Sequence, residues 1–561
     1  MKNFFLPSLS LIVLLNISSC TFLGKKEEPT VNTYSNPIFS GFYPDPSICK
    51  AEDRYYLVQS SFSYFPGIPI FESIDLVNWT QIGHVLDRPD QLDTEGQGVS
   101  RGLFAPAITF HQGTFYLVCT HIDRKGNFVV IATDPAGPWS DPILLPDVHG
   151  IDPSLYFEGN QAFIVYNSDP PDYKPLYNGH RTIRMYELDI NTLQPKGDQV
   201  QLVNGGVDIS KEPVWIEAPH IYKINGLYYL MCAEGGTGYN HSEVIFRSEK
   251  ITGPYEPWDQ NPILTQRQLD PARPFPVTTA GHADLIQAPG GDWWAVFLAC
   301  RPYGDNYYNI GRETFMTPVA WTEDGWPVIN PDFEEVQYTY PTPMGNMVDT
   351  TGFKYNGNFS FRDHFDSSRL GYNYMFLRTP KEKWYQIMNG KLIMRVRPET
   401  ASGLSNPSFI GHRQQHRRGS ASASVSFDPG QGSEIAGLLF FQSEQNYYLF
   451  GKSMNESQPV IALYQSGANS LTQLASVTIE ESENIFLKVD FDDENYTFSY
   501  TSDPSYWTVL KDSVDGTLLS TKVAGGFVGS VIALYATSNG SASENTVSFD
   551  WFEYTGKDEV Y

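Results

Sequence analysis

The sequence predicts an all-β protein with two domains, a five-bladed β-propeller followed by a β-sandwich of the jelly-roll, concanavalin-like kind. Three observations support this prediction. Short runs of alternating apolar and polar residues fill most of the 561-residue chain, and no long amphipathic helical pattern interrupts them. A small motif followed by an apolar strand occurs five times in the first half. The second half carries alternating strands without that motif, which is typical of sandwiches.

Residues 1–20 have the pattern of an export signal. Lys2 precedes an apolar stretch, residues 4–15, that is too short to span a membrane as a helix. Small residues before Cys20 resemble a bacterial lipobox, which predicts lipidation of Cys20; an ordinary signal peptide with a chance cysteine is the alternative. We therefore expect an exported outer-membrane lipoprotein, on the periplasmic or the cell-surface face. Residues 21–32 would be a tether, and the lipid would be the only membrane contact.

Five copies of one motif begin the predicted blades of residues 33–337. Successive copies lie about 50 to 65 residues apart, which is the spacing of propeller blades. Because the innermost strand of each blade borders the central axis, residues at the start of these strands are expected to converge. The copies read YPDPSI, FAPAI, IDPSL, EAPHI and HADLI, and they begin at Tyr43, Phe104, Ile151, Glu217 and His282.

Three carboxylates and a histidine are expected around this axis. Asp45 and Asp152 fall at the same repeat position, and Glu217 and His282 fall one position earlier. Flanking prolines stiffen the backbone at both aspartates. Glu217 follows an apolar pair, so partial desolvation would raise its pKa and keep it protonated. A single Asp-Pro pair is explained as a turn at a strand start, but three acids in phase favour an active site.

These motifs resemble glycoside hydrolase family 43, five-bladed propeller enzymes that act on xylan and arabinan side chains. The resemblance covers essentially the whole mature chain, and it rests on YPDPS, GIDPSL, WIEAPHIYK, EGGT, GHADLI and CRPYGDNYYNIGRET. It implies that Asp45 is the general base, Glu217 the general acid, and Asp152 the carboxylate that tunes and orients the acid. It also implies inversion of the anomeric centre, with base and acid roughly 6.5–9.5 Å apart.

The same resemblance implies further binding residues. Phe62 and Phe104 match aromatic positions against the sugar, although the family often has tryptophan at the second; core packing is the alternative. His282 matches a pocket-floor histidine that holds a calcium through waters in some members; support of the axis is the alternative. Arg301 matches an arginine that binds sugar hydroxyls; a structural ion pair is the alternative, and that is the role expected for the pair Arg312–Glu313. No cofactor is required, and a structural calcium is the one metal that the resemblance allows.

The net charge narrows the class of partner. The net charge is −26, from 64 acidic and 38 basic residues, and such a surface repels phosphate backbones, so we expect no nucleic acid partner. A neutral polysaccharide remains compatible.

Four cysteines stand among apolar residues and are expected to be buried free thiols, namely Cys49, Cys119, Cys232 and Cys300.

The second half begins with a linker and continues as the sandwich. Residues 338–357 are rich in proline, glycine and threonine, which predicts a linker. Residues 358–561 carry the alternating runs of the second domain. This part resembles the sandwich of the family's β-xylosidases, whose loops close one side of the pocket and favour chain ends.

The sequence therefore predicts an inverting exo-β-xylosidase that releases xylose from xylo-oligosaccharides. An α-L-arabinofuranosidase, or an enzyme with both activities on xylo- or arabino-oligosaccharides, is the nearest alternative, since the two pentoses present similar hydroxyl geometry. A non-catalytic glycan-binding surface protein is the alternative of another class. A fructan hydrolase is disfavoured, because the Trp-Asn-Asp-Pro-type signature of those propellers is absent. A long loop on the third blade, residues 169–184, is a candidate for shaping leaving-group specificity.

Overall fold

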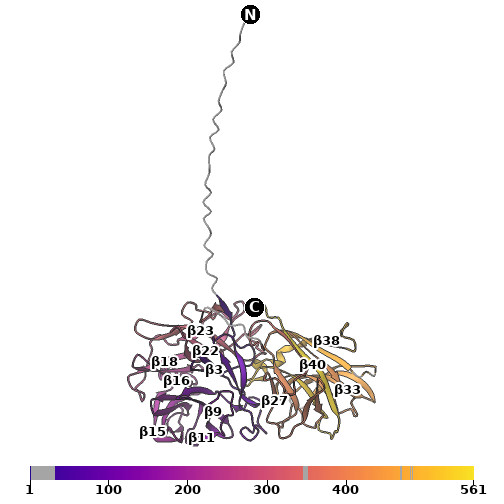
Figure 1. Cartoon of the computed structure of the whole chain (residues 1–561), viewed down its shortest axis with the longest axis horizontal. Helices are drawn as coiled ribbons and strands as arrows, with labels where there is room; N and C mark the ends of the chain where they lie inside the picture. The colour runs from indigo at the N-terminus through magenta and orange to yellow at the C-terminus, as the bar shows by residue number, and fades with distance from the viewer. Residues whose placement is uncertain (2–31, 345–351, 468–469, 481, 483) are drawn as a thin grey trace.

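The computed structural model describes residue 1 and residues 32–344, 352–467, 470–480, 482 and 484–561. Within these ranges the chain forms two β-domains that lie side by side (Figure 1). The predicted fold class, a five-bladed propeller followed by a concanavalin-like sandwich, is confirmed. The predicted signal peptide, Cys20 and residues 21–31 of the tether lie outside the described residues. In the described part of the chain, no helix is long and apolar enough to cross a membrane.

Each propeller blade is an antiparallel sheet whose first strand contacts the first strands of its neighbours, so these strands surround the axis. The blades consist of β2 (Ser47–Ala51), β3 (Arg54–Val58), β5 (Gly67–Ser73) and β6 (Thr80–Leu86); of β8 (Ala107–His111), β9 (Thr114–Ile122), β10 (Gly126–Ala132) and β11 (Ile143–Leu144), with β7 (Gly102–Leu103) beside β9; of β12 (Ile151–Glu158), β13 (Gln161–Ser168), β14 (Thr182–Leu188) and β15 (Pro195–Asn204); of β16 (Glu217–Ile224), β17 (Leu227–Glu234), β18 (Ser242–Ser248) and β19 (Glu256–Pro257), with β20 (Leu264–Thr265) beside β18; and of β21 (Thr278–Gln287), β22 (Trp293–Cys300), β23 (Glu313–Trp321) and β24 (Pro327–Ile329).

Several contacts join the first blade, and the chain before it, to the last blade and the chain after it. The short strand β1 (Thr33–Ser35) pairs with β25 (Thr339–Pro341), which lies at the start of the predicted linker. The carboxylate of Asp284 in β21 accepts hydrogen bonds from the hydroxyl of Ser47 at 2.8 Å and from the backbone amide of Ile48 at 2.9 Å. These bonds satisfy a buried carboxylate at the axis and close the ring. The four predicted free cysteines are buried and unbridged, as expected.

The second domain packs two eight-stranded sheets face to face. Strand β36 shows why: its alternate residues Ile485, Leu487, Val489 and Phe491 are buried, while the residues between them are partly exposed. One sheet contains β28 (Tyr385–Met388), β29 (Lys391–Arg395), β40 (Thr546–Gly556), β31 (Arg418–Ser426), β36 (Asn484–Asp492), β37 (Asn495–Thr501) and β38 (Thr508–Asp515), with β26 (Ser360–Asp363) beside β40. The other contains β35 (Leu471–Thr478), β34 (Gln458–Ser466), β33 (Asn446–Asn455), β32 (Ile435–Ser443), β39 (Val531–Thr537), β30 (Ser408–Arg413), β27 (Tyr374–Leu377) and β4 (Tyr64–Phe65).

Strand β4 belongs to the propeller in sequence but to the sandwich in space. It leaves the first blade between β3 and β5 and pairs with β27, so that Phe65 lies opposite Phe376. Figure 1 places β27 at the boundary of the two domains. The apolar core is continuous across this boundary, because buried residues of the first two blades pack with those of the sandwich. A shared apolar core of this kind holds the two domains in one arrangement.

A β-bulge recurs in three of the five innermost strands. The pairing register shifts between Ile151 and Ser154 in β12, between Glu217 and His220 in β16, and between Gly281 and Asp284 in β21. A bulge bends its strand and redirects side chains, and bulges are common beside active sites. We therefore expect the bulged residues to point into the axial space instead of along the sheet.

The backbone at these bulges corrects one detail of the sequence alignment. In each bulge, the residue that follows the last paired residue before the shift has a positive φ. The values are 50° at Asp152, 51° at Ala218 and 56° at His282. Asp45, just before β2, has the same conformation with φ 55°. His282 is therefore in phase with the two aspartates, and only Glu217 stands one residue earlier. The alignment was wrong for His282 because Leu285 is the residue in register with Leu155 and Ile221. The motif letters alone do not distinguish Leu285 from the neighbouring Ile286.

Candidate active site

One pocket at the propeller axis collects the predicted chemical groups. Its volume is about 330 Å³, near the lower end of the roughly 300–1,000 Å³ of small-molecule sites. Five blades contribute through the starts of their innermost strands, and the sandwich contributes one residue. The lining consists of Asp45, Phe62, Arg101, Phe104, Ala105, Ile122, Ile151, Asp152, Arg181, Trp215, Glu217, Thr237, His282, Arg312 and Phe527.

Asp45 is held as an ionised carboxylate. Its Oδ2 accepts a hydrogen bond from the Ser60 hydroxyl at 2.6 Å, and its Oδ1 accepts one from Arg312 Nη1 at 3.1 Å. His282 Nδ1 lies 3.8 Å from Oδ1. Burial alone would raise the pKa of Asp45, but Arg312, His282 and Ser60 outweigh it and hold the pKa below its usual range. A carboxylate that stays ionised is suited to accept a proton.

Glu217 is in the opposite state. Burial, followed by the negative charges of Asp152 and Asp45, raises the pKa of Glu217 well above its usual range. Burial and the charge of Asp45 also raise the pKa of Asp152, but the backbone amide of Ala218 favours its ionised form. We therefore assign the proton of this pair to Glu217. The pocket thus pairs an acceptor with a donor, as general acid–base chemistry requires.

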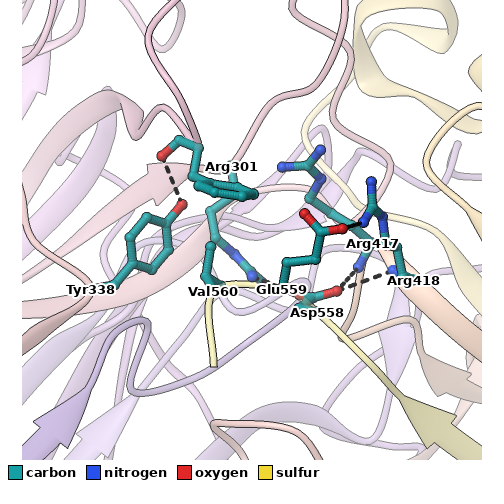
Figure 2. Close-up of a pocket in the computed structure, with 8 residues that line it drawn as sticks. Arg301, Tyr338, Arg417, Arg418, Asp558, Glu559 and Val560 are labelled. Atoms are coloured by element: carbon teal, nitrogen blue, oxygen red, sulfur yellow. Dashed lines mark hydrogen bonds and ion pairs between the residues drawn. The ribbon is translucent and has the colours of Figure 1, made fainter.

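The expectation for Arg301 is wrong, and the alternative of a structural ion pair is right. Arg301 is 1% exposed and lies outside the pocket. Its Nε and Nη2 donate to the carboxylate of Glu313 at 2.7 and 2.8 Å, and its Nη1 donates to Asp558 at 2.7 Å. Figure 2 shows Arg301 beside Asp558 and Val560 of the C-terminal segment and Tyr338. This arginine ties the C-terminal segment to the propeller.

Arg312 occupies the place expected for Arg301. It precedes β23, and its neighbour Glu313 faces Arg301, so the expected ion pair between Arg312 and Glu313 is also wrong. Adjacent residues of an extended segment point to opposite sides, so Arg312 and Glu313 face different partners. The Arg312 Nη1 donates to Asp45 and, at 2.8 Å, to the hydroxyl of Thr237 in the EGGT motif. A guanidinium fixed this way is suited to bind sugar hydroxyls.

Aromatic rings form one wall of the pocket. Phe62 is 2% exposed and packs between Phe42 and Phe527, with ring centroids 5.9 Å from each. Phe104 meets Phe62 edge-on at 5.7 Å and is more open to the pocket. Both predicted rings therefore reach the pocket, but Phe62 mainly supports the wall, because it is nearly enclosed by other rings.

Phe527 is the pocket residue that comes from the sandwich, and the sequence analysis did not find it. It follows the short helix α1 (Thr521–Ala524), and its backbone amide donates to the Ser100 hydroxyl at 2.9 Å. Gly526 makes this approach possible, since its φ is +75° and a Cβ there would lie 2.3 Å from Ser100 Oγ. In the sequence, Phe527 is marked only by the run Gly525-Gly526-Phe527. The fold is needed to show which surface this loop contacts.

His282 lines the pocket floor as a neutral imidazole. Burial lowers its pKa to about 4, although the charge of Asp45 acts in the opposite direction. Among the described residues, no group of three or more His, Cys, Asp or Glu side chains is arranged to hold a metal ion directly. These side chains therefore do not fit direct coordination, and the calcium held by His282 through waters stays a prediction.

The fold and the pocket together define a class of enzyme. An ionised carboxylate and a protonated one, in a sugar-sized pocket with an aromatic wall, are the equipment of a glycoside hydrolase. Residues 34–327 match Glycosyl hydrolases family 43, and residues 362–555 match the Beta xylosidase C-terminal Concanavalin A-like domain. The chain belongs to glycosyl hydrolase family 43, an inverting family.

Several relatives match over nearly their whole length. A xylosidase/arabinosidase of Butyrivibrio fibrisolvens is 36% identical over 92% of this chain and 98% of its own. A non-reducing end alpha-L-arabinofuranosidase of Bacteroides ovatus is 36% identical over 93% of this chain and 94% of its own. Among solved structures, a family 43 enzyme of subgroup 12 from a capybara gut metagenome is 41% identical, with a TM-score of 0.85, covering 91% of this chain and 96% of that one.

Proposed function

We propose that this protein is an inverting exo-glycosidase that removes a terminal pentose, with β-xylosidase activity on xylo-oligosaccharides as the first candidate. The observation that carries the proposal is the convergence of Asp45 and Glu217 in one pocket that shifts their pKa values in opposite directions. The sandwich supports the exo mode, because Phe527 closes one side of that pocket. A closed pocket accepts a chain end more readily than the middle of a chain.

The proposed reaction assigns one task to each side chain. Asp45 takes a proton from a water molecule while the water oxygen attacks the anomeric carbon, and Glu217 gives its proton to the departing oxygen. The glycosidic bond breaks, a new carbon–oxygen bond forms on the opposite face, and no covalent enzyme intermediate is involved. Asp152 keeps the pKa of Glu217 high, and Arg312 binds hydroxyls of the terminal sugar next to the base.

α-L-Arabinofuranosidase activity is the second candidate. The relatives favour it, since one of them is named for both xylosidase and arabinosidase activity and another for arabinofuranosidase activity. The carboxylates serve either substrate, because both reactions need the same acid and base. Discrimination between the two sugars therefore depends on the walls of the pocket instead of its acid and base.

Initial rates on 4-nitrophenyl β-D-xylopyranoside and 4-nitrophenyl α-L-arabinofuranoside test the proposal. We expect turnover of at least one, and the ratio of the two kcat/KM values decides between xylosidase, arabinofuranosidase and dual activity. The non-catalytic alternative predicts binding of oligosaccharides without release of either pentose. Turnover of neither glycoside, nor of the matching oligosaccharides, would reject both candidate activities.

We also propose that the enzyme is anchored at the outer membrane through lipidated Cys20, with its substrate outside the cytoplasm. The support is the sequence pattern of residues 1–20, which lies outside the described residues. Metabolic labelling with an alkynyl fatty acid tests this, because wild type should take up the label and a Cys20→Ala variant should not. Equal labelling of both would contradict the anchor.

A further inference from the structure

Three arginine–aromatic pairs line the pocket, and the proposed mechanism gives a task to only one of them, the pair of Arg312 and Phe527. In each pair a guanidinium lies over an aromatic ring, and a carboxylate fixes the guanidinium. The pairs are Arg312 over Phe527 at 5.6 Å, fixed by Asp45; Arg101 over Phe104 at 5.7 Å, fixed by Asp123; and Arg181 over Trp215 at 4.7 Å, fixed by Asp169.

The pair of Arg181 and Trp215 lies on the side of the acid. Trp215 precedes Glu217 by two residues, and both side chains line the pocket. The positive charge of Arg181 is one of the groups that act on Glu217 electrostatically. Because the acid protonates the oxygen of the departing sugar, that sugar must lie next to Glu217. The third pair is therefore on the leaving-group side of the pocket.

This pair is held rigidly before any substrate arrives. Arg181 donates through Nε and Nη2 to Asn167 Oδ1 at 3.1 and 2.7 Å, and through Nη1 to Asp169. Asn167 in turn donates to the carbonyl of Ile216, next to Glu217. The backbone amide of Trp215 donates to Gly179 at 2.8 Å, and Trp215 itself has a φ of 61°. A network that fixes both side chains and the acid's own strand lowers the entropic cost of binding.

Each member still has surface to offer a ligand. A guanidinium carries five N–H donors, and these contacts use three of them, which leaves two. Trp215 is half-buried, so part of its indole faces the pocket. A flat ring covers the C–H face of a pyranose, and nearby N–H groups bond its hydroxyls. Because Asp169 compensates the charge of Arg181, a neutral sugar fits better than an acidic one.

We propose that Arg181 and Trp215 form the subsite for the departing sugar, a neutral pyranose unit of the substrate chain. The inference rests on the proposed function, since it takes Glu217 as the acid. It gives the long loop of the third blade, which carries Arg181, a direct part in choosing the leaving group. The pair acts on binding of the sugar chain and leaves the binding of the terminal pentose to the other walls.

Two measurements on a Trp215→Ala variant test the proposal. The first is kcat/KM for the disaccharide that the wild type hydrolyses faster, xylobiose or α-L-arabinofuranosyl-(1→3)-xylose, both of which have a xylopyranose as the departing sugar. The second is the inhibition constant of the released pentose, which binds only the terminal-sugar side. We expect kcat/KM for the disaccharide to fall at least tenfold and the inhibition constant to change less than twofold. Trp215→Phe keeps a ring and should recover most of the loss.

Arg181→Gln should lower disaccharide kcat/KM in the same way and shift the basic limb of its pH profile upward, since it removes a positive charge near Glu217. Arg247→Ala is a matched control, because Arg247 covers Trp326 at 4.1 Å far from the pocket lining. That control should leave both measurements within twofold of wild type.

Other outcomes reject the subsite or the function behind it. Equal changes in the disaccharide and pentose measurements would place Trp215 on the terminal-sugar side. No change in either measurement would show that Trp215 does not bind the substrate. A wild-type protein that hydrolyses no glycoside would instead reject the proposed function itself.

Discussion

The floor and the walls of the pocket have different origins. The floor comes from the repeated strand starts of the propeller, which supply Asp45, Asp152, Glu217 and His282. The walls come from segments outside the repeated motif, such as Phe527 of the sandwich and Arg312 before β23. The repeated motif therefore supplies the acid and the base, whereas contacts between distant segments shape the surface that the sugar meets. Changes to the base or the acid on the floor should therefore abolish catalysis, removal of Asp152 should shift its pH dependence, and changes to the walls should alter rates and preferences.

The largest effect is expected at the floor, from Asp45→Asn. The amide keeps the shape of the carboxylate but is no longer a base, so kcat should fall about 10³- to 10⁴-fold. Steady-state rates on the better aryl glycoside measure the loss, and calorimetric titration with the released pentose checks that binding remains. A variant that hydrolyses as fast as wild type would remove Asp45 from the mechanism.

Two arginines eleven positions apart in the sequence sharpen the comparison next. Arg301→Met leaves Glu313 and Asp558 buried without their cation, and breaking such a pair costs about 3–5 kcal/mol of unfolding free energy. Arg312→Met loses a charged hydrogen bond inside the pocket, which predicts a fall in kcat/KM of roughly 100-fold. Chemical denaturation and steady-state kinetics on both variants check the two expectations.

We expect Arg301→Met to show the larger loss of stability and Arg312→Met the larger loss of activity per folded molecule. The reverse pattern would restore Arg301 to the substrate and contradict the arrangement described above.

Phe527→Ala tests the wall that the sandwich provides. Aromatic contacts of this kind contribute about 0.5–1.5 kcal/mol beyond burial, so kcat/KM should fall roughly tenfold. The ratio of xyloside to arabinofuranoside rates should change as well. Tyr506→Ala is a matched control, because Tyr506 is an exposed aromatic residue of the same domain outside the pocket. If both variants behave as wild type, the sandwich does not shape the pocket.

The smallest effect is a shift in pH dependence from Asp152→Asn. The negative charge of Asp152 helps to raise the pKa of Glu217, so its removal should lower that pKa. The acid would then lose its proton at a lower pH, and the basic limb of the kcat/KM profile should move downward. The position of the acidic limb should change less. A basic limb that moves upward, or stays in place, would show that Asp152 does not tune the acid.

The fold and the pocket floor could be predicted from the sequence, because both depend on local, repeated patterns of residues. The strand starts at Asp45, Asp152 and Glu217 could be aligned by their letters, and strand alternation indicated the sandwich. Three features of the pocket could not be predicted from the sequence, for physical reasons. The phase of His282 depends on the strand register, which places Leu285 and not Ile286 at the repeated apolar position. The exchange of Arg301 and Arg312 depends on which way each side chain faces, and Phe527 and Arg181 depend on contacts between distant segments.

The proposed mechanism requires one pocket that keeps Asp45 ionised and Glu217 protonated, and the pH dependence of wild-type kcat/KM measures both states. That profile reports the pKa values of the essential base and acid in the free enzyme. We expect an acidic limb below the ordinary carboxyl range and a basic limb well above it, so that the enzyme stays active around neutral pH. A profile whose two limbs both fall at ordinary carboxyl pKa values, with activity lost before neutrality, would contradict it.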